Sequence, residues 1–377
     1  MNQIIDKILA ELDKSGNLRK FPTESQDARY VDLSSNDYLG IASDTGLQTE
    51  FLNSTDFGCM QFTSSASRLL SRSQQPYTQF EETLADAYGC EKQALLFNSG
   101  YHANTGLISA FASTKAYIIA DKLVHASIID GIKLSGLPFA RFRHNDYSQL
   151  DRLAAKVYGE GYNIIIIAES VYSMDGDCAD IDTLAEIKRR YPGALLYIDE
   201  AHAVGVEGPA GLGICKASAN FENVDIVVGT LGKALASSGA FAITSETMRK
   251  FMINKSRSLI FSTAIAPINV LWSRFTFQHT LGMDTERHHL KQLGAALSTE
   301  LKSVGKSMHS GHIQPLIVGE PHLAVELSKK LRTEGFEVLP IRTPTVPPGT
   351  DRLRFSLSAA LNLDDISRLG EALRKIF

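Results

Sequence analysis

The chain has few cysteines, no excess of charge of one sign and no long hydrophobic run. Its 377 residues carry 38 Lys and Arg against 42 Asp and Glu, a formal net charge of −4. Electrostatic binding to nucleic acid or to an anionic membrane needs an excess of positive charge, so we expect neither partner. The longest apolar run, Ile164–Ala168, is far shorter than the roughly 18 residues that cross a bilayer.

The cysteines and the N-terminus indicate a cytoplasmic protein. The four cysteines, Cys59, Cys90, Cys178 and Cys215, lie far apart and form no Cys-x-x-Cys pair. This spacing argues against a disulfide framework and against a cysteine-based zinc site, and we expect no metal ion. Residues Met1–Gly16 place isoleucines and leucines at helical spacing with acidic residues between them. They are typical of an amphipathic helix rather than of a signal peptide.

The hydrophobic pattern predicts an α/β fold. Hydrophobic residues make up 44% of the chain and charged residues 21%, as in ordinary globular proteins. From about residue 90, short apolar runs alternate with amphipathic segments, which predicts a mostly parallel sheet with helices on both faces. Ligands of such sheets bind beyond the carboxyl ends of the strands. The predicted strands are Ala94–Phe97, Ala116–Ala120, Phe139–Arg143, Ile164–Glu169, Leu195–Asp199, Ile226–Gly229 and Ala240–Thr244.

The last third of the chain predicts a second, smaller α+β domain. It follows a helical region at about residues 266–304 and contains three short apolar runs separated by helices near residues 321–334 and 363–376. The runs are Ile313–Val318, Glu337–Ile341 and Leu353–Leu357. We therefore expect an N-terminal helix with a substrate-contact segment at 1–45, a large domain at 46–280 and a small domain at 281–377.

The run from Asp199 to His202 reads Asp-Glu-Ala-His, which also matches the acidic motif of some helicases. An ATPase of that kind needs a phosphate loop, Gly-x-x-x-x-Gly-Lys-[Ser/Thr]. At Gly232-Lys233 the first required glycine is replaced by Val227, and Ala234 follows the lysine. An ATPase is therefore not expected.

Lys233 and Asp199 together indicate pyridoxal phosphate chemistry. Lys233 follows an apolar strand and is flanked by small residues, an environment that frees an amine for bonding to an aldehyde. Pyridoxal phosphate also needs a carboxylate to keep its pyridine nitrogen protonated. Asp199 ends the preceding strand, 34 positions before Lys233, so in a parallel sheet both reach the same edge. Ser99 and Gly100 join a strand to a helix, whose N-terminus could bind the phosphate or form an ordinary N-cap.

These motifs resemble those of the pyridoxal-phosphate-dependent α-oxoamine synthases. The resemblance covers nearly the whole chain and implies the aspartate-aminotransferase-like fold, fold type I, with a homodimer that shares its active sites. The matching segments are Ser35–Gly40, His125–Gly131, Ser173–Asp177, Asp199–His202, Thr230–Lys233 and Pro344–Pro347.

The resemblance assigns a role to each matching position. Lys233 would bind the cofactor and move the Cα proton of the substrate, and His125 would stack on the ring and assist acyl transfer. Asp199 would pair with the ring nitrogen and His202 with the phenolic oxygen. Further cofactor contacts would come from Ser173, Thr230, Gly100 and Tyr101, and, toward a neighbouring subunit, from Ser262 and Thr263. The substrate ligands would be Arg354 and Asn36 for the amino-acid carboxylate, and Thr345 and Arg19 for the acyl group.

The reaction that the resemblance implies is a decarboxylative condensation of L-alanine with a pimeloyl thioester, carried by coenzyme A or by an acyl carrier protein, in biotin biosynthesis. A sister synthase that uses glycine, serine or another thioester, such as a 2-amino-3-ketobutyrate ligase, is the nearest alternative. An aminotransferase and a non-catalytic binding protein with the same fold are more distant ones. The presence of Asp199, His202 and Lys233 argues against a non-catalytic binding protein.

Two segments depart from the family pattern. The family usually has Gly-Ser-Gly-Gly-Ser-Arg where this chain has Thr63–Arg68, and a histidine where it has Gln74–Thr78. Side chains that replace glycines narrow the space at the first segment. The departures therefore bear on the acyl group and its carrier more than on the cofactor.

Overall fold

The computed structural model describes residues 1–19, 21, 30–56, 61–72, 74–89, 91–305 and 309–377. Cys59 and Cys90 lie outside the described residues. The chain divides into two compact units. The sheet unit consists of Leu39–Tyr172 and Cys178–Arg287, and the terminal unit consists of Met1–Tyr38, Ser173–Asp177 and His288–Phe377.

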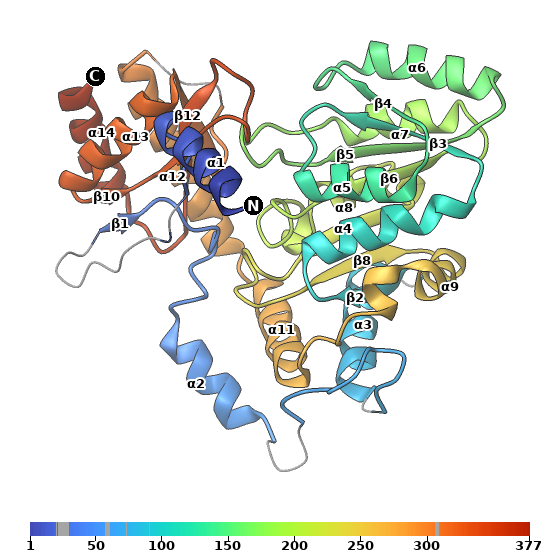
Figure 1. The fold of residues 1–377 in the computed structure, drawn as a ribbon. Coiled ribbons are helices and arrows are strands. Elements are labelled where there is room, and N and C mark those ends of the chain that lie inside the picture. Colours follow the sequence, from blue (N-terminus) through green and yellow to red (C-terminus); the bar gives the residue numbers. More distant parts are fainter. Residues whose placement is uncertain (20, 22–29, 57–60, 73, 90, 306–308) are drawn as a thin grey trace. The chain divides into compact units, whose positions relative to one another are not determined.

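The sheet unit is built on a seven-stranded sheet (Figure 1) with the strand order β2-β8-β7-β6-β5-β3-β4. Strand β8 runs antiparallel to both of its neighbours, and the other pairs are parallel. The prediction of a mostly parallel sheet is therefore confirmed. The strands are β2 (Gln93–Phe97), β3 (Ala116–Asp121), β4 (Phe139–Phe142), β5 (Asn163–Glu169), β6 (Leu195–Asp199), β7 (Ile226–Thr230) and β8 (Ala240–Thr244).

Helices cover both faces of this sheet because successive side chains of each buried strand point to opposite sides. In β5, Ile165 and Ile167 belong to one hydrophobic cluster with residues of α4, α5, α9 and α10, whereas Ile164 and Ile166 belong to a second cluster with residues of α3, α6, α7 and α11. The helices are α2 (Thr45–Ser54), α3 (Gln75–Tyr88), α4 (Gly100–Ser109), α5 (Ala126–Ser135), α6 (Tyr147–Gly159), α7 (Ile181–Arg189), α8 (Ile214–Ala217), α9 (Glu246–Lys255), α10 (Arg257–Ile260) and α11 (Pro267–Thr280).

The helices nearest to the carboxyl ends of the strands begin at polar caps. The Ser99 hydroxyl accepts the backbone N–H of His102 at the start of α4, and the His125 ring accepts that of Ser127 at the start of α5. A cap of this kind satisfies one of the N–H groups that the first turn leaves without a partner. Helix α5 ends at Gly136, whose φ of 64° is left-handed.

The terminal unit contains a three-stranded antiparallel sheet in the order β11-β12-β9 and a short parallel pair of β1 with β10. Helix α1 (Asn2–Lys14), predicted as amphipathic, has no buried residue. The remaining elements are β1 (Val31–Asp32), α12 (Asp284–Ser303), β9 (Ile313–Gly319), α13 (Pro321–Thr333), β10 (Phe336–Glu337), β11 (Leu339–Ile341), β12 (Asp351–Ser356) and α14 (Leu363–Ile376).

Two predicted elements are each divided in the structure. The helical region at 266–304 is two helices, α11 and α12, because Gly282 is a poor helix former and Arg287 donates to the carbonyl of Thr280 at the end of α11 (2.8 Å). The predicted strand Glu337–Ile341 is divided between β10 and β11, which pair with β1 and β12 respectively.

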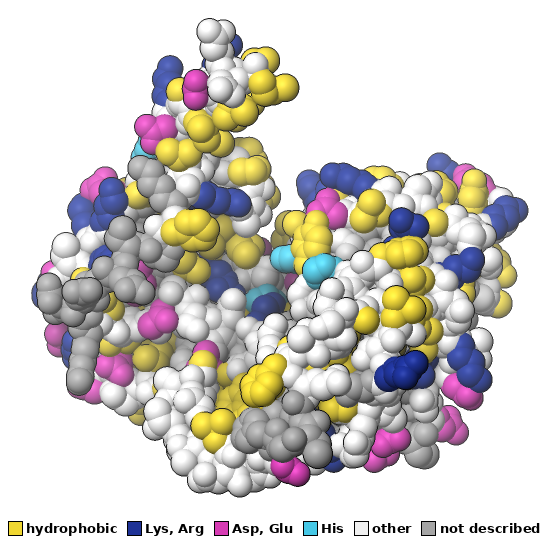
Figure 2. All heavy atoms as spheres, turned by 60° about the horizontal axis from the view of Figure 1, so that its bottom comes forward, with side chains coloured by type: hydrophobic (Ala, Val, Ile, Leu, Met, Phe, Trp, Pro, Cys, Tyr) yellow, Lys and Arg dark blue, Asp and Glu magenta, His cyan; other side chains and the backbone are white. Residues whose placement is uncertain are grey.

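The charge pattern of the described surface agrees with the composition. Basic and acidic side chains lie interspersed on the face that Figure 2 shows. Among the described residues, no helix has both the length and the hydrophobicity of a membrane span.

Gly229 in β7 provides a test of the packing that holds the strand before Lys233. A Cβ atom at this position would lie 2.3 Å from the ring of Phe241 on β8. We expect Gly229→Ala to destabilise the protein by about 1–3 kcal/mol through overpacking, measured by urea unfolding. Gly159→Ala is the control, since a Cβ there has no atom within 4 Å. Equal stabilities of the two variants would contradict this account.

Candidate functional site

Asp199 and Lys233 come to one edge of the sheet, as the sequence predicts. Strands β6 and β7 are adjacent and parallel, with Asp199 opposite Val228. The chain leaves β7 at Thr230 and reaches Lys233 three residues later. The Lys233 Nζ lies 2.7 Å from Nε2 of His202, which is buried in the turn after β6. The sheet therefore brings an amine, an imidazole and a carboxylate together.

The Asp199 carboxylate is held from two directions. Its Oδ1 accepts the backbone N–H of Ala201 (2.8 Å), and its Oδ2 accepts a side-chain N–H of Asn104 (2.7 Å). Asp199 is only 5% exposed, and a buried carboxylate is stable only when such donors surround it. An ionised carboxylate has about four lone-pair sites, so these two bonds leave acceptor capacity for a ligand.

His125 presents an exposed ring at the start of α5. Its Nδ1 lies 2.7 Å from the Ser127 hydroxyl and also accepts the Ser127 backbone N–H. Desolvation by the surrounding atoms lowers the pKa of His125 below its ordinary value, against the opposite effect of Asp199. The imidazole is therefore neutral at pH 7, and an exposed neutral ring can stack on a flat heterocycle.

Glu169 belongs to the same edge and was missed from the sequence. It ends β5 opposite Asp199 and accepts the backbone N–H of His125. Burial, followed by the nearby Asp199, raises its pKa well above the ordinary value. The sequence does contain a pattern that could have identified Glu169. It is a carboxyl group at the end of a buried apolar strand, the same pattern that identified Asp199.

The turn from β2 to α4 offers a phosphate site. Gly100 and Tyr101 contribute the first N–H groups of α4, which have no acceptor within the helix. A Cβ on Gly100 would lie 3.9 Å from the Thr230 side chain, so the helix start lies beside the end of β7. The Tyr101 hydroxyl donates to Asp130 (2.5 Å). Ser99 acts as an N-cap, and the remaining N–H groups can bind an anion.

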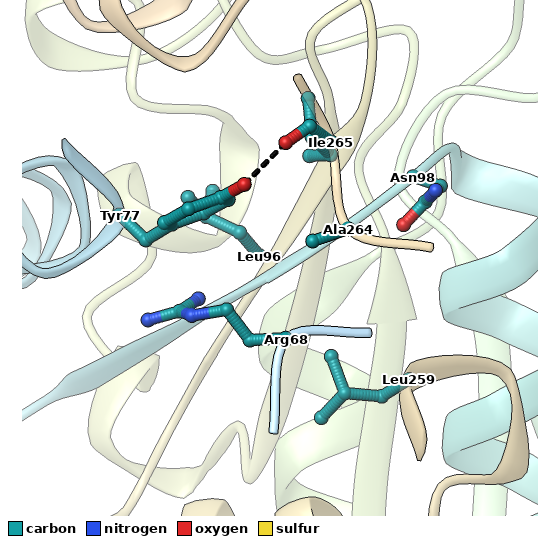
Figure 3. A pocket seen from close by; sticks show the side chains of 7 residues that line it. All are labelled: Arg68, Tyr77, Leu96, Asn98, Leu259, Ala264 and Ile265. Atoms are coloured by element: carbon teal, nitrogen blue, oxygen red, sulfur yellow. Dashed lines mark hydrogen bonds between the residues drawn. The ribbon is translucent and has the colours of Figure 1, made fainter. Parts of the chain in front are cut away.

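Ser262 and Thr263 lie beside this turn. Asn98 donates to the carbonyl of Thr263 (2.6 Å), and Thr263 forms a β-bridge with Ser67. Figure 3 shows the small pocket of about 10 Å³ between these segments, lined by residues that include Arg68, Tyr77 and Asn98.

The departures from the family pattern have a structural explanation. Arg68 binds the buried Glu81 (2.9 Å) and lies over the Tyr77 ring. Gln74, in the segment where the family usually has a histidine, accepts from Arg68 Nε (2.6 Å) and so holds that side chain. Ser65 stands in the glycine-rich position and has a left-handed φ of 50°. The backbone therefore keeps a conformation that glycine favours, although a serine is present.

The predicted carboxylate ligands meet within the terminal unit. Arg354 on β12 is 3% exposed, and its Nε donates to the Ser173 carbonyl (2.6 Å) while Nη2 donates to Asn36 (3.2 Å). Arg354 is therefore a buried arginine and not a solvated one on the strand surface. Arg352, two residues earlier, reaches Asp175 in the same short segment (2.5 Å), because residues two apart in a strand point to the same side. Ser173 therefore contacts Arg354 through its backbone, and lies in a different unit from Lys233.

Arg19 and Thr345 line a second cavity of the terminal unit. They are joined by a hydrogen bond of 3.3 Å, and the cavity has a volume of about 600 Å³. Arg342 lines it too and was not predicted, although it stands three residues before Thr345. The rest of the lining is Leu9, Leu12, Asn17, Leu18, Pro340, Ile341, Thr343 and Pro344. Such a cavity, mostly apolar with two guanidinium groups, suits a carbon chain with an anionic end.

Comparison with known proteins gives one consistent result. The sequence model of the family Aminotransferase class I and II matches residues 28–373. A protein of Pasteurella multocida (strain Pm70) is 43% identical over 378 residues, covering 98% of this chain and 97% of its own. One of Glaesserella parasuis serovar 5 is 46% identical over 372 residues, covering 96% and 97%. Both carry the name "Putative 8-amino-7-oxononanoate synthase".

Solved structures agree with the sequence comparison. The 8-amino-7-oxononanoate synthase from Francisella tularensis is 29% identical, with a TM-score of 0.77 over 92% of this chain and 97% of that one. A serine palmitoyltransferase from S. paucimobilis, solved with a bound PLP–myriocin adduct, is 26% identical, with a TM-score of 0.87 over 99% and 97%. The aspartate-aminotransferase-like fold predicted from the sequence is confirmed.

Glu200, next to Asp199, is expected to make the stability of the protein depend on pH. It is fully buried, accepts the backbone N–H of Cys215 (3.0 Å), and burial raises its pKa to about 7. Between about pH 4.5 and pH 7 the folded protein keeps a proton that the unfolded chain has lost, so stability falls as the pH rises. We expect Glu200→Gln to reduce the stability lost between pH 5 and pH 8 by about 1–3 kcal/mol, measured by urea unfolding.

The control for this measurement is Glu186→Gln, at an exposed glutamate on α7, which should keep the wild-type pH dependence. If Glu200→Gln and wild type lose stability equally over this range, the assignment of a shifted carboxyl group to Glu200 is wrong.

Proposed function

The chain belongs to the aminotransferase class I and II family, and from this premise we propose that it condenses L-alanine with a pimeloyl thioester to give 8-amino-7-oxononanoate. Carbon dioxide and the free thiol carrier are the other products. The observation that carries the proposal is the contact of Lys233 with His202 beside Asp199. The enzyme is a pyridoxal-phosphate-dependent acyltransferase, and the names of its relatives support the choice of substrates.

The donor set fits pyridoxal 5′-phosphate. It combines a lysine amine, a carboxylate with acceptor capacity, a buried imidazole, an exposed neutral imidazole and a helix N-terminus beside Thr230. When bound, this cofactor takes up the electron pair that remains on the substrate Cα after a bond to that carbon breaks.

We propose a separate role in cofactor binding or proton transfer for each of these residues. We assign Lys233 to binding the cofactor aldehyde and to moving the Cα proton. Asp199 keeps the ring nitrogen protonated, and His202 donates to the phenolic oxygen. His125 would stack on the ring, and the N–H groups of Gly100 and Tyr101, near Thr230, would hold the phosphate. Ser173, from the terminal unit, is proposed as a further cofactor contact.

The terminal unit is proposed to bind the substrates. The Arg354 guanidinium, with Asn36 beside it, binds the alanine carboxylate, because a buried guanidinium is a good partner for a carboxylate. The cavity at Arg19 and Thr345 binds the pimeloyl chain. In the reaction, the alanine Cα forms a bond to the thioester carbonyl carbon as the C–S bond breaks. The carboxylate then leaves as carbon dioxide, and a proton returns to Cα.

A homodimer with shared sites is part of the proposal. Four large hydrophobic side chains are more than half exposed on the two segments that the Ser67–Thr263 bridge joins. Exposed apolar groups of this size in one region favour a protein interface. These side chains are Phe62, Leu69, Leu70 and Phe261. In the dimer, Ser262 and Thr263 would contact the phosphate of the partner's cofactor.

The reaction itself is tested with purified protein, pyridoxal phosphate, L-alanine and pimeloyl-coenzyme A or the pimeloyl carrier protein. We expect 8-amino-7-oxononanoate by mass spectrometry and loss of both cofactor absorbance and turnover in Lys233→Ala. Turnover of serine or glycine in place of alanine would instead identify a sister synthase. Full turnover by Lys233→Ala would overturn the proposal.

The two substrate sites are tested by reciprocal variants. We expect Arg354→Lys to raise the KM for L-alanine about tenfold or more, because a lysine cannot reproduce the guanidinium geometry. Arg19→Gln should raise the KM for the thioester by a similar factor. Each variant is the control for the other. Steady-state kinetics with both substrates varied gives the KM for L-alanine and the KM for the thioester in each variant. Equal effects on both substrates would contradict the assignment.

A further inference from the structure

We propose that Asn104 is a positioning residue that orients two groups at once, the Asp199 carboxylate and, through Ser127, the ring of His125. The inference rests on the proposed function for the roles of Asp199 and His125. Neither the family pattern nor the sequence motifs assigned a role to Asn104. It lies on the buried face of α4, one turn after the proposed phosphate site.

The amide of Asn104 is fully engaged. Its Nδ2 donates to Asp199 Oδ2 (2.7 Å) and to Ser127 Oγ (2.9 Å), and its Oδ1 accepts the Tyr197 hydroxyl (2.6 Å). Asn104 is 2% exposed, and the side chains of Tyr197 and Ser127 are fully buried. Three bonds without competing water fix the plane of the amide.

The direction of these bonds follows from the chemistry of the partners. Burial raises the pKa of Tyr197 well above its ordinary value, so this hydroxyl remains a donor and faces the amide oxygen. The amide NH₂ then faces Asp199, where it donates to Oδ2 (2.7 Å), since the amide oxygen on that side would place two acceptor oxygens together. The orientation of Asn104 is therefore set by Tyr197 on one side and Asp199 on the other.

The same bonds fix the tautomer of His125. Ser127 Oγ accepts from Asn104, so its own proton is available to His125 Nδ1, 2.7 Å away. The Ser127 backbone N–H also donates to this nitrogen. With two donors directed at Nδ1, the proton of the neutral imidazole lies on Nε2. Asn104 thus gives His125 a defined ring orientation and an Nε2–H donor.

Three variants distinguish the hydrogen bonds that Asn104 makes to Asp199, to Ser127 and to Tyr197. Asn104→Leu removes every bond at similar volume, Ser127→Ala cuts only the branch to His125, and Tyr197→Phe removes only the bond to the amide oxygen. The first readout is ¹⁵N NMR of the apoprotein labelled at histidine, with the His125 signals assigned by their loss in His125→Gln. The second readout is the Kd for pyridoxal phosphate, from absorbance titration at a fixed pH.

In wild type we expect an Nε2-protonated His125. In Asn104→Leu and Ser127→Ala we expect a larger Nδ1-protonated fraction than in wild type, because only the Ser127 backbone N–H then remains fixed on Nδ1. The Kd for pyridoxal phosphate should rise about tenfold in Asn104→Leu, through the loss of one buried charge-assisted bond to Asp199. It should change less than threefold in Ser127→Ala, and Tyr197→Phe should retain the wild-type tautomer of His125.

A purely structural role for Asn104 would lower the melting temperature without changing the His125 tautomer or the cofactor Kd in the folded variants. That result overturns the inference, and so does an Nδ1-protonated His125 in wild type. If Asn104→Leu does not fold, a wild-type tautomer in Ser127→Ala is sufficient to overturn it. Failure of wild type to bind pyridoxal phosphate would instead refute the proposed function, which the apoprotein NMR measurement does not depend on.

Discussion

Two neighbouring parallel strands must end at the same edge of a sheet, and the site depends on this property of β6 and β7. Their pairing places Asp199 opposite Val228 and leaves only a short segment before Lys233. The adjacent β5 adds Glu169 opposite Asp199. The strand register therefore sets which titratable groups lie near one another, before any side-chain packing is considered.

The edge of the sheet carries more carboxyl groups than one cationic cofactor ring can neutralise. Asp199 is surrounded by donors, whereas burial raises the pKa values of Glu169 and Glu200. Burial therefore favours the protonated, uncharged form of Glu169 and Glu200. Under the proposed function, Asp199 would then be the carboxylate that pairs with the ring nitrogen.

The sequence predicts the strands and the edge residues because buried parallel strands are continuous apolar runs that end abruptly. Asp199 and Lys233 stand out at those ends, and the resemblance to a family supplied Arg354 and His125. Asn104 was not predicted as a functional residue, because an asparagine within an amphipathic helix carries no local sign of a partner 95 residues away on β6. Arg342 was missed for a similar reason, since only the folded terminal unit brings α1 to its side.

Ser65 adopts, without being a glycine, a backbone conformation that glycine favours. The residue has a φ of 50°, and the Thr63 hydroxyl accepts its backbone N–H (3.1 Å). Its side chain is exposed, so no neighbour must move to admit it. A search by residue identity reads this loop as divergent, whereas a search by backbone dihedral angles would align it with glycine-containing loops of the same shape. The left-handed backbone at this position therefore does not require the glycine motif.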